Sequence, residues 1–177
     1  MFPAKRYGLI YADPAWLMRD PCTSGRRGSI FKYQCMPLTE MMQLPVPDIA
    51  ADNCLLAMWW LSSMPGEAIL LAEAWGFKVK HMTGFVWHKK TTRGNDHFGM
   101  GSYTRAGAES CLFGVRGKFS RASASVRQVI SAPVGRHSEK PNEARLRLEK
   151  LVGDVPKIEL FARTRHPGWE AWGNELS

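Results

Sequence analysis

Cysteine is scarce in this sequence, and the few cysteines do not form a recognisable site. The 177 residues include four cysteines, Cys22, Cys35, Cys54 and Cys111, with no C-x-x-C pair and no close spacing to the five histidines. This spacing argues against a zinc site and, in a chain of this length, against a disulfide framework. Cys54 and Cys111 lie within apolar runs, so we expect both to be buried thiols.

Long apolar runs are also missing. No segment reaches the roughly 20 apolar residues that a transmembrane helix needs. Lys5 and Arg6 precede only a short apolar run, unlike the start of a secretory signal peptide. Together with the unpaired cysteines, these features predict a cytoplasmic protein that has no membrane partner.

Acidic residues are outnumbered by basic ones. The chain has 24 lysines and arginines against 16 aspartates and glutamates, which gives a net charge of +8. A polyanion is the partner that this balance favours, and nucleic acid is the first candidate. A solvated basic surface without a ligand is the alternative.

The remaining composition is that of one globular domain. Hydrophobic residues make up 45% and charged residues 23% of the chain, which is ordinary for a folded protein. Repeats, low-complexity tracts and linkers are missing from the sequence, so we expect a single domain over residues 1–177.

Apolar runs alternate with helical patterns along the chain. The runs expected to form strands are 7–12, 53–60, 78–87, 109–115, 126–130 and 157–162. Apolar residues three or four positions apart predict helices over 68–75 and 144–152, with Gly76 and Gly153 after them. A shorter helix is expected over 38–44, before Pro45. This alternation predicts an α/β three-layer sandwich with a largely parallel sheet.

The tetrapeptide Asp13-Pro14-Ala15-Trp16 follows directly on the first predicted strand. Pro14 ends the strand, and in open α/β sheets ligands bind at that edge. The Asp13 carboxylate and the Pro14 carbonyl oxygen can accept the two N–H bonds of an amino group on a flat heterocycle, and the Trp16 indole can stack on the ring. The alternative is a simple turn, in which Asp13 caps backbone amides and Trp16 belongs to the core.

The motif resembles the Asp-Pro-Pro-Trp signature of the N6-adenine methyltransferases related to the eukaryotic mRNA adenosine methyltransferase. Further segments similar to this family follow in its order: Phe31-Lys32-Tyr33, Trp87-His88-Lys89-Lys90, and residues 107–117, 138–143, 158–163 and 169–175. The resemblance covers roughly residues 7 to 175. It implies a Rossmann-like methyltransferase fold in which the catalytic motif precedes the cofactor motif.

The resemblance also implies a reaction and a set of site residues. It implies methyl transfer from S-adenosylmethionine to the N6 amine of adenine, without a metal, with Asp13, Pro14 and Trp16 as the catalytic residues. The residues implied to bind the cofactor are Asp13, Lys140, Arg163, Arg165, Asn174 and Glu175. The residues implied to bind the target are Trp16, Tyr33, Lys89, Lys90, Tyr103, Arg105 and Glu109.

The short single-domain sequence resembles the phage and prophage members of the family that modify DNA, which favours DNA as the substrate. RNA is one alternative, and a nucleic-acid-binding subunit without catalysis is another. A monomer and a homodimer both remain open. The sequence departs from the family pattern at Ala15, where proline is usual, at Ala162, in the glycine-rich cofactor turn, and at Gly135, where arginine is common.

Overall fold

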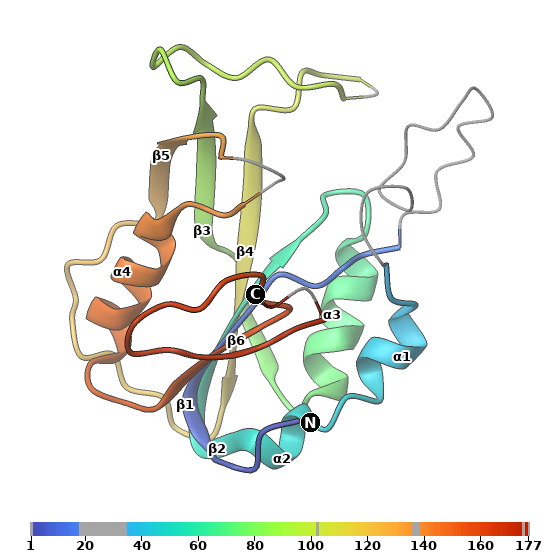
Figure 1. Cartoon of the computed structure of the whole chain (residues 1–177), viewed down its shortest axis with the longest axis vertical. Coiled ribbons are helices and arrows are strands. Elements are labelled where there is room, and N and C mark those ends of the chain that lie inside the picture. Colours follow the sequence, from blue (N-terminus) through green and yellow to red (C-terminus); the bar gives the residue numbers. More distant parts are fainter. Residues whose placement is uncertain (1, 18–34, 102, 136–138, 175, 177) are drawn as a thin grey trace.

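The computed structural model describes residues 2–17, 35–101, 103–135, 139–174 and 176. They contain a sheet whose seven strands lie in the order β5-β3-β4-β2-β1-β6-β7 (Figure 1). In chain order the strands are β1 (Tyr7–Ala12), β2 (Ala50–Trp60), β3 (Lys78–Lys90), β4 (Ala108–Arg116), β5 (Val129–Pro133), β6 (Lys157–Leu160) and β7 (Glu170–Trp172).

The sheet is mixed, with mostly parallel neighbours. β1 pairs in parallel with β2 and β6, β3 pairs in parallel with β5, and β6 with β7. Only β4 runs antiparallel to its neighbours, β2 and β3. The expected Rossmann-like α/β fold is therefore confirmed. Every strand except β4 has its C-terminal end at the same edge of the sheet, and the first residues of β4 lie there too.

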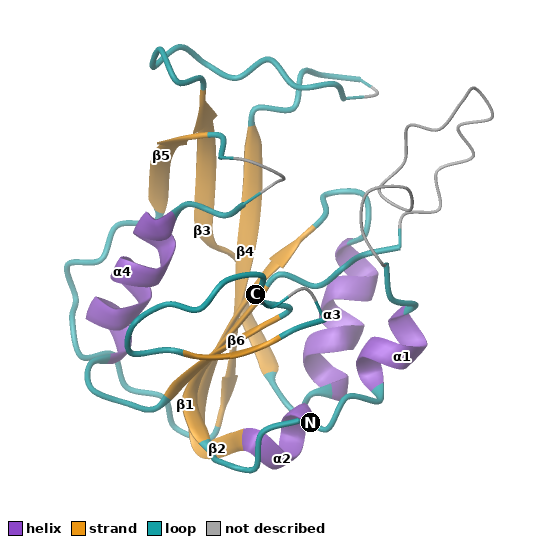
Figure 2. Cartoon of the chain, in the orientation of Figure 1, coloured by secondary structure: helices purple, strands orange, loops and turns teal. Residues whose placement is uncertain are grey.

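Helices cover both faces of the sheet (Figure 2). The short α1 (Leu38–Met42), α2 (Val46–Ile49) and the longer α3 (Pro65–Ala74) lie on one side, and α4 (Asn142–Val152) lies on the other. Because strand side chains alternate between faces, β2 supplies both cores: Leu56 and Met58 pack toward α3, and Ala57 and Trp59 pack toward α4. The predicted three layers are present.

The helix ends follow local sequence signals. Gly76 and Gly153 adopt positive φ angles of 82° and 73° just after α3 and α4, a conformation that glycine tolerates best. Pro65 and Pro141 stand at the starts of the same helices, where a missing N–H costs nothing. None of the helices in the described ranges is long and apolar enough to cross a membrane.

Several elements differ from the sequence prediction: β2 begins at Ala50 rather than at residue 53, β3 continues to Lys90, and β6 ends at Leu160 rather than at residue 162. The helix expected over 38–44 ends at Met42, and a separate helical turn, α2, follows Pro45. The fifth strand begins at Val129 rather than at residue 126. The three-residue strand β7 was not predicted, because so short a segment carries no alternating pattern.

Candidate active site

Four charged side chains form a continuous row at the C-terminal edge of the sheet. Lys89 Nζ lies 2.5 Å from Glu109 Oε1, and Lys140 Nζ lies 3.1 Å from Glu109 Oε2 and 2.9 Å from Asp13 Oδ2. We call these four residues the charge row. It joins the end of β3, the start of β4 and the end of β1, with Lys140 contributed by the segment that leads into α4.

Two buried tryptophans form the floor beneath the lysines of the charge row. Lys140 Nζ lies 5.7 Å from the centroid of the Trp59 ring, and Lys89 Nζ lies 5.2 Å from that of Trp87. The two indoles meet edge to face, with their centroids 6.5 Å apart. An ammonium group over an indole face is attracted by the ring quadrupole. The floor therefore stabilises both lysines in addition to their carboxylate partners.

The two central members of the charge row, Glu109 and Lys140, stay ionised although they are largely buried. Burial by itself would raise the pKa of Glu109, but the positive charges of Lys140 and Lys89 lower it below its ordinary value. Burial would likewise lower the pKa of Lys140, but Asp13 and Glu109 raise it above its ordinary value. Glu109 and Lys140 are thus held charged by their neighbours.

The depressed pKa of Glu109 predicts a pH-dependent contribution to stability. The folded protein binds the Glu109 proton more weakly than the unfolded chain does, so the stabilisation is fully present above the unfolded pKa of 4.5 and is lost as the pH falls through the lower folded pKa. Urea unfolding below pH 4.5 should therefore show a steeper loss of stability for the wild type than for Glu109→Gln. Glu73→Gln, on the exposed face of α3, is the control. Parallel curves for wild type and Glu109→Gln would contradict the pairing.

The motif after β1 is pinned to the core. The Trp16 side chain is 6% exposed and its Nε1–H donates to the Trp59 carbonyl oxygen at 3.2 Å. The Trp16 backbone N–H donates to the Pro14 carbonyl oxygen at 2.8 Å. In this conformation Trp16 is a core residue, and stacking on a target base would require its packing to open. The Pro14 carbonyl retains one lone pair for a further donor.

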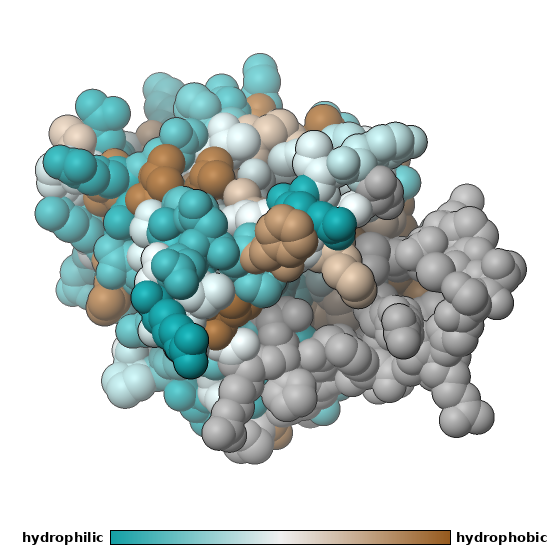
Figure 3. Space-filling model, turned by 90° about the horizontal axis from the view of Figure 1, so that it is seen from above, coloured by the Kyte–Doolittle hydropathy of each residue, from teal (hydrophilic) through white to brown (hydrophobic). Residues whose placement is uncertain are grey.

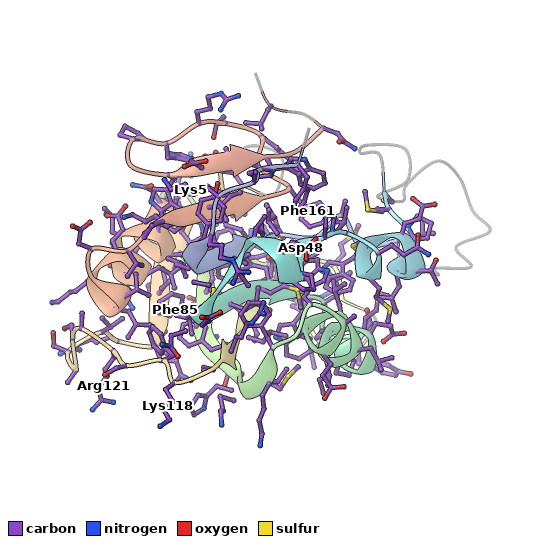
Figure 4. The ribbon with its side chains drawn as sticks, turned by 90° about the horizontal axis from the view of Figure 1, so that it is seen from below. Lys5, Asp48, Phe85, Lys118, Arg121 and Phe161 are labelled. Atoms are coloured by element: carbon purple, nitrogen blue, oxygen red, sulfur yellow. The ribbon has the colours of Figure 1, made fainter. Side chains whose placement is uncertain are left out.

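Besides Asp13 and Lys140, the residues expected to bind the cofactor follow β6 and β7. Phe161 has a φ angle of 60° directly after β6, and its ring lies between Trp75 and Trp172 (Figure 4 labels it). An added Cβ on Gly173 would lie 2.2 Å from the Ala162 carbonyl oxygen, so the two segments touch. Arg163 is partly buried, whereas Arg165 and Asn174 are exposed. Glu175 lies outside the described residues.

The other residues expected to contact the target are spread along the loop between β3 and β4. Lys90 pairs with Asp96 at 2.6 Å, Arg105 lies over the Phe98 ring, and Tyr103 is fully exposed. Tyr33 lies outside the described residues. Apart from Trp16 of the motif itself, the predicted target residues that the described part of the chain connects to Asp13 are Lys89 and Glu109, through Lys140.

Basic residues are not confined to this edge. Lys118 and Arg121 follow β4 at the opposite edge of the sheet and are exposed there (Figure 4). In the described part of the chain, basic side chains are therefore present at both edges of the sheet. In the parts of the chain that the structure describes, no group of three or more His, Cys, Asp or Glu side chains could hold a metal ion.

Sequence reasoning missed a second buried ion pair next to the site. Arg145 of α4 donates to both carboxylate oxygens of Glu159 on β6, at 2.7 and 2.8 Å, and its guanidinium lies over the Tyr11 ring. Arg145 is 5% and Glu159 7% exposed. The available signal was weak: an arginine within an apolar helical stripe and a glutamate within an apolar strand.

The fold and the edge site together define a class of protein. A mixed α/β sheet covered by helices on both faces, with charged side chains gathered at the C-terminal ends of its strands, is the arrangement of a Rossmann-like protein with a ligand site at that edge. The chain belongs to the MT-A70 family, whose model matches residues 7–175. It is a methyltransferase of that family.

Methyltransferases of several kinds are similar in sequence to this chain. A type II methyltransferase, M.MunI, from Mycoplasma sp is 37% identical over 98% of this chain and 79% of its own length. The human N(6)-adenine-specific methyltransferase METTL4 is 28% identical, and this chain spans 38% of it. The N6-methyladenosine RNA methyltransferase MTA1 of Cryphonectria parasitica is also 28% identical, and the chain spans 52% of it.

Proposed function

We propose that the protein transfers the methyl group of S-adenosylmethionine to the N6 amine of adenine in DNA. The observation that carries the proposal is the Asp13 carboxylate, fixed by Lys140 where β1 ends between β2 and β6. An ionised carboxylate at this edge suits an amine that becomes positively charged during the reaction.

The residues around Asp13 fit the cofactor chemically. Lys140 and Arg163 can bind a carboxylate, and Asp13 can accept from an ammonium group. Arg163 and Asn174 directly follow Ala162 and Gly173, two residues that lie in close contact. The Asn174 amide can bond ribose hydroxyls. Acceptor, donor and amide groups are thus available for the carboxylate, ammonium and ribose ends of S-adenosylmethionine.

Three residues of the charge row, Asp13, Lys140 and Glu109, have separate tasks in this proposal. When bound, S-adenosylmethionine supplies a methyl group on a positively charged sulfur, which keeps the electron pair of the C–S bond as the methyl carbon bonds to the amine nitrogen. Asp13 accepts an N–H bond from the amine and stabilises the positive charge that develops on the nitrogen. Asp13 is also the nearest acceptor for the proton that this nitrogen then loses. Lys140 orients the Asp13 carboxylate, and Glu109 holds Lys140.

DNA is favoured over RNA as the substrate. This chain covers 79% of the length of one relative, which is a type II methyltransferase. The RNA methyltransferase of similar sequence keeps RNA as the alternative. A non-catalytic nucleic-acid-binding subunit is less well supported, because such a subunit has no need for an intact row of four ions at the end of β1.

The proposal is tested by methyl transfer to defined oligonucleotides. Tritiated S-adenosylmethionine should label DNA that contains adenine, and digestion should return the label as N6-methyladenine. Matched RNA and adenine-free DNA are the controls. Label in RNA alone would replace DNA with the RNA alternative, and absence of label from every oligonucleotide would contradict catalysis.

A further inference from the structure

The loop between β3 and β4 presents large apolar side chains to solvent. Phe98 is 75% exposed, Met100 is 88% exposed, and Tyr103 is fully exposed. In Figure 1 this loop projects beyond the ends of both strands. Seen from above, toward this edge, apolar side chains lie among hydrophilic ones (Figure 3). Exposed side chains of this size lack the stabilisation that burial would give, and several of them on one loop can mark a binding site.

Backbone hydrogen bonds hold this loop in a defined shape. The His97 N–H donates to the Lys89 carbonyl oxygen at 3.0 Å, and the Gly99 N–H donates to that of Ala106 at 3.1 Å. An added Cβ on Gly99 would lie 2.3 Å from the Ala106 carbonyl oxygen, so the two segments of the loop are in close contact. Phe98 is therefore presented from a fixed backbone.

The surroundings of Phe98 are basic. The Arg105 guanidinium lies 4.8 Å from the centroid of the Phe98 ring. Arg93 is exposed near the turn of the loop. The acidic residue of this stretch, Asp96, is paired with both Lys90 and His88, at 2.6 and 2.9 Å. Among the residues that the structure describes, neither arginine forms an ion pair with a carboxylate, and an apolar side chain beside such an arginine suits a polyanion that also offers flat apolar surfaces.

The loop is continuous with the charge row. Its two ends are Lys89 on β3 and Ala108 on β4, directly before Glu109, and the Lys89 N–H donates to the Gly107 carbonyl oxygen at 2.8 Å. A duplex that delivers an adenine to Asp13 must therefore pass close to this loop.

We propose that Phe98, supported by Arg105, is a wedge that enters the DNA duplex and fills the space left when the target adenine leaves the base stack. This inference rests on the proposed function and adds to it that the substrate is double-stranded. A methyltransferase cannot reach an exocyclic amine inside the stack without extruding the base, and apolar side chains such as Phe and Met are commonly inserted between base steps. Met100, two residues further along, extends the same apolar surface.

A protein partner fits this loop less well than a duplex does. The exposed apolar side chains are separated by the glycines Gly99 and Gly101 and flanked by arginines. The core of a protein interface, by contrast, is a contiguous apolar patch depleted of charge. Docking of a second copy of this chain is therefore treated as an outcome of the test.

The test compares methylation of three substrates by wild type and Phe98→Ala. The first is a matched, unmethylated duplex that contains the sequence in which the enzyme methylates adenine. The second is the same duplex with a mismatch opposite the target adenine, and the third is the single strand. Eversion costs less energy in the mismatched duplex and is not needed in the single strand. We expect Phe98→Ala to lose about tenfold in rate on the matched duplex, the scale of a lost stacking contact. The loss should be much smaller on the other two substrates.

The control and the contrary outcomes separate this inference from the proposed function. Leu70→Ala, which removes an exposed apolar side chain from α3, should leave all three rates unchanged. An equal loss for Phe98→Ala on all substrates, or none, would overturn the wedge while the methyltransferase stands. A self-association that depends on Phe98 in sedimentation, with unchanged substrate ratios, would make the loop a protein interface instead. A wild type that labels no oligonucleotide overturns the proposed function, and the wedge with it.

Discussion

Asp13→Ala is expected to abolish methyl transfer while leaving the affinity for S-adenosylmethionine within a few fold of wild type. The carboxylate stabilises the positive charge that develops on the amine nitrogen. Comparable electrostatic contacts lower the activation barrier by about 2.7–4 kcal/mol. Cofactor affinity is retained because other residues after β6 and β7 bind the remaining groups of the cofactor. Single-turnover methyl transfer and calorimetric titration with the cofactor measure the two quantities separately.

Two further variants make this experiment specific. Asp13→Asn keeps the size of the side chain but removes the charge that Lys140 contacts, so it should be nearly as inactive as Asp13→Ala. Asp48→Ala, at an exposed carboxylate on α2 (Figure 4), should retain wild-type activity. A fully active Asp13→Ala enzyme would end the proposed mechanism.

Arg145→Ala is expected to cause the largest loss of stability among these variants. It removes both hydrogen bonds to Glu159 and leaves that carboxylate buried without its partner. Breaking a buried ion pair in this way costs about 3–5 kcal/mol. Urea unfolding followed by circular dichroism measures the change in the free energy of unfolding.

The double variant Arg145→Leu with Glu159→Leu distinguishes loss of a partner from loss of packing. With no buried charge left unpaired, it should be markedly more stable than Arg145→Ala. Arg6→Ala, which breaks the exposed pair with Asp52, should change stability little, because exposed ion pairs contribute little. Equal stabilities for Arg145→Ala and Arg6→Ala would contradict the assigned role of the buried pair.

Long periodic segments were predictable from the sequence, and short ones were not. The apolar run that became β1 and the stripes of α3 and α4 extend over six or more residues, which is long enough to indicate the type of element. The strand β7 and the turn α2 are too short for such a pattern, and tertiary contacts decide them. The expected burial of Cys54 and Cys111 is confirmed, because both are fully buried in the two cores.

The candidate site was predictable as a list of residues but not as a set of contacts. The end of β1 located Asp13, and the resemblance to a family named Lys140, Glu109 and Lys89. The sequence does not predict that these residues pair directly with one another. The resemblance implies a contact of Lys89 with the nucleic acid and of Lys140 with the cofactor. Which ion meets which depends on how β4 inserts between β2 and β3, and that is a property of the sheet order. The order of strands in the sheet cannot be deduced from short segments of the sequence.

The alternation of charge along the row sets a condition on what can enter the site. Two carboxylates and two ammonium groups sum to zero, so each ion already has a partner of opposite sign. A ligand that carries both a carboxylate and an ammonium group can exchange partners with the row and leave every ion neutralised. A ligand with only one of these groups would leave one ion of the charge row without a partner of opposite charge in a largely buried position, at a cost of several kcal/mol. The amino-acid end of a ligand is thus selected by charge balance as well as by shape.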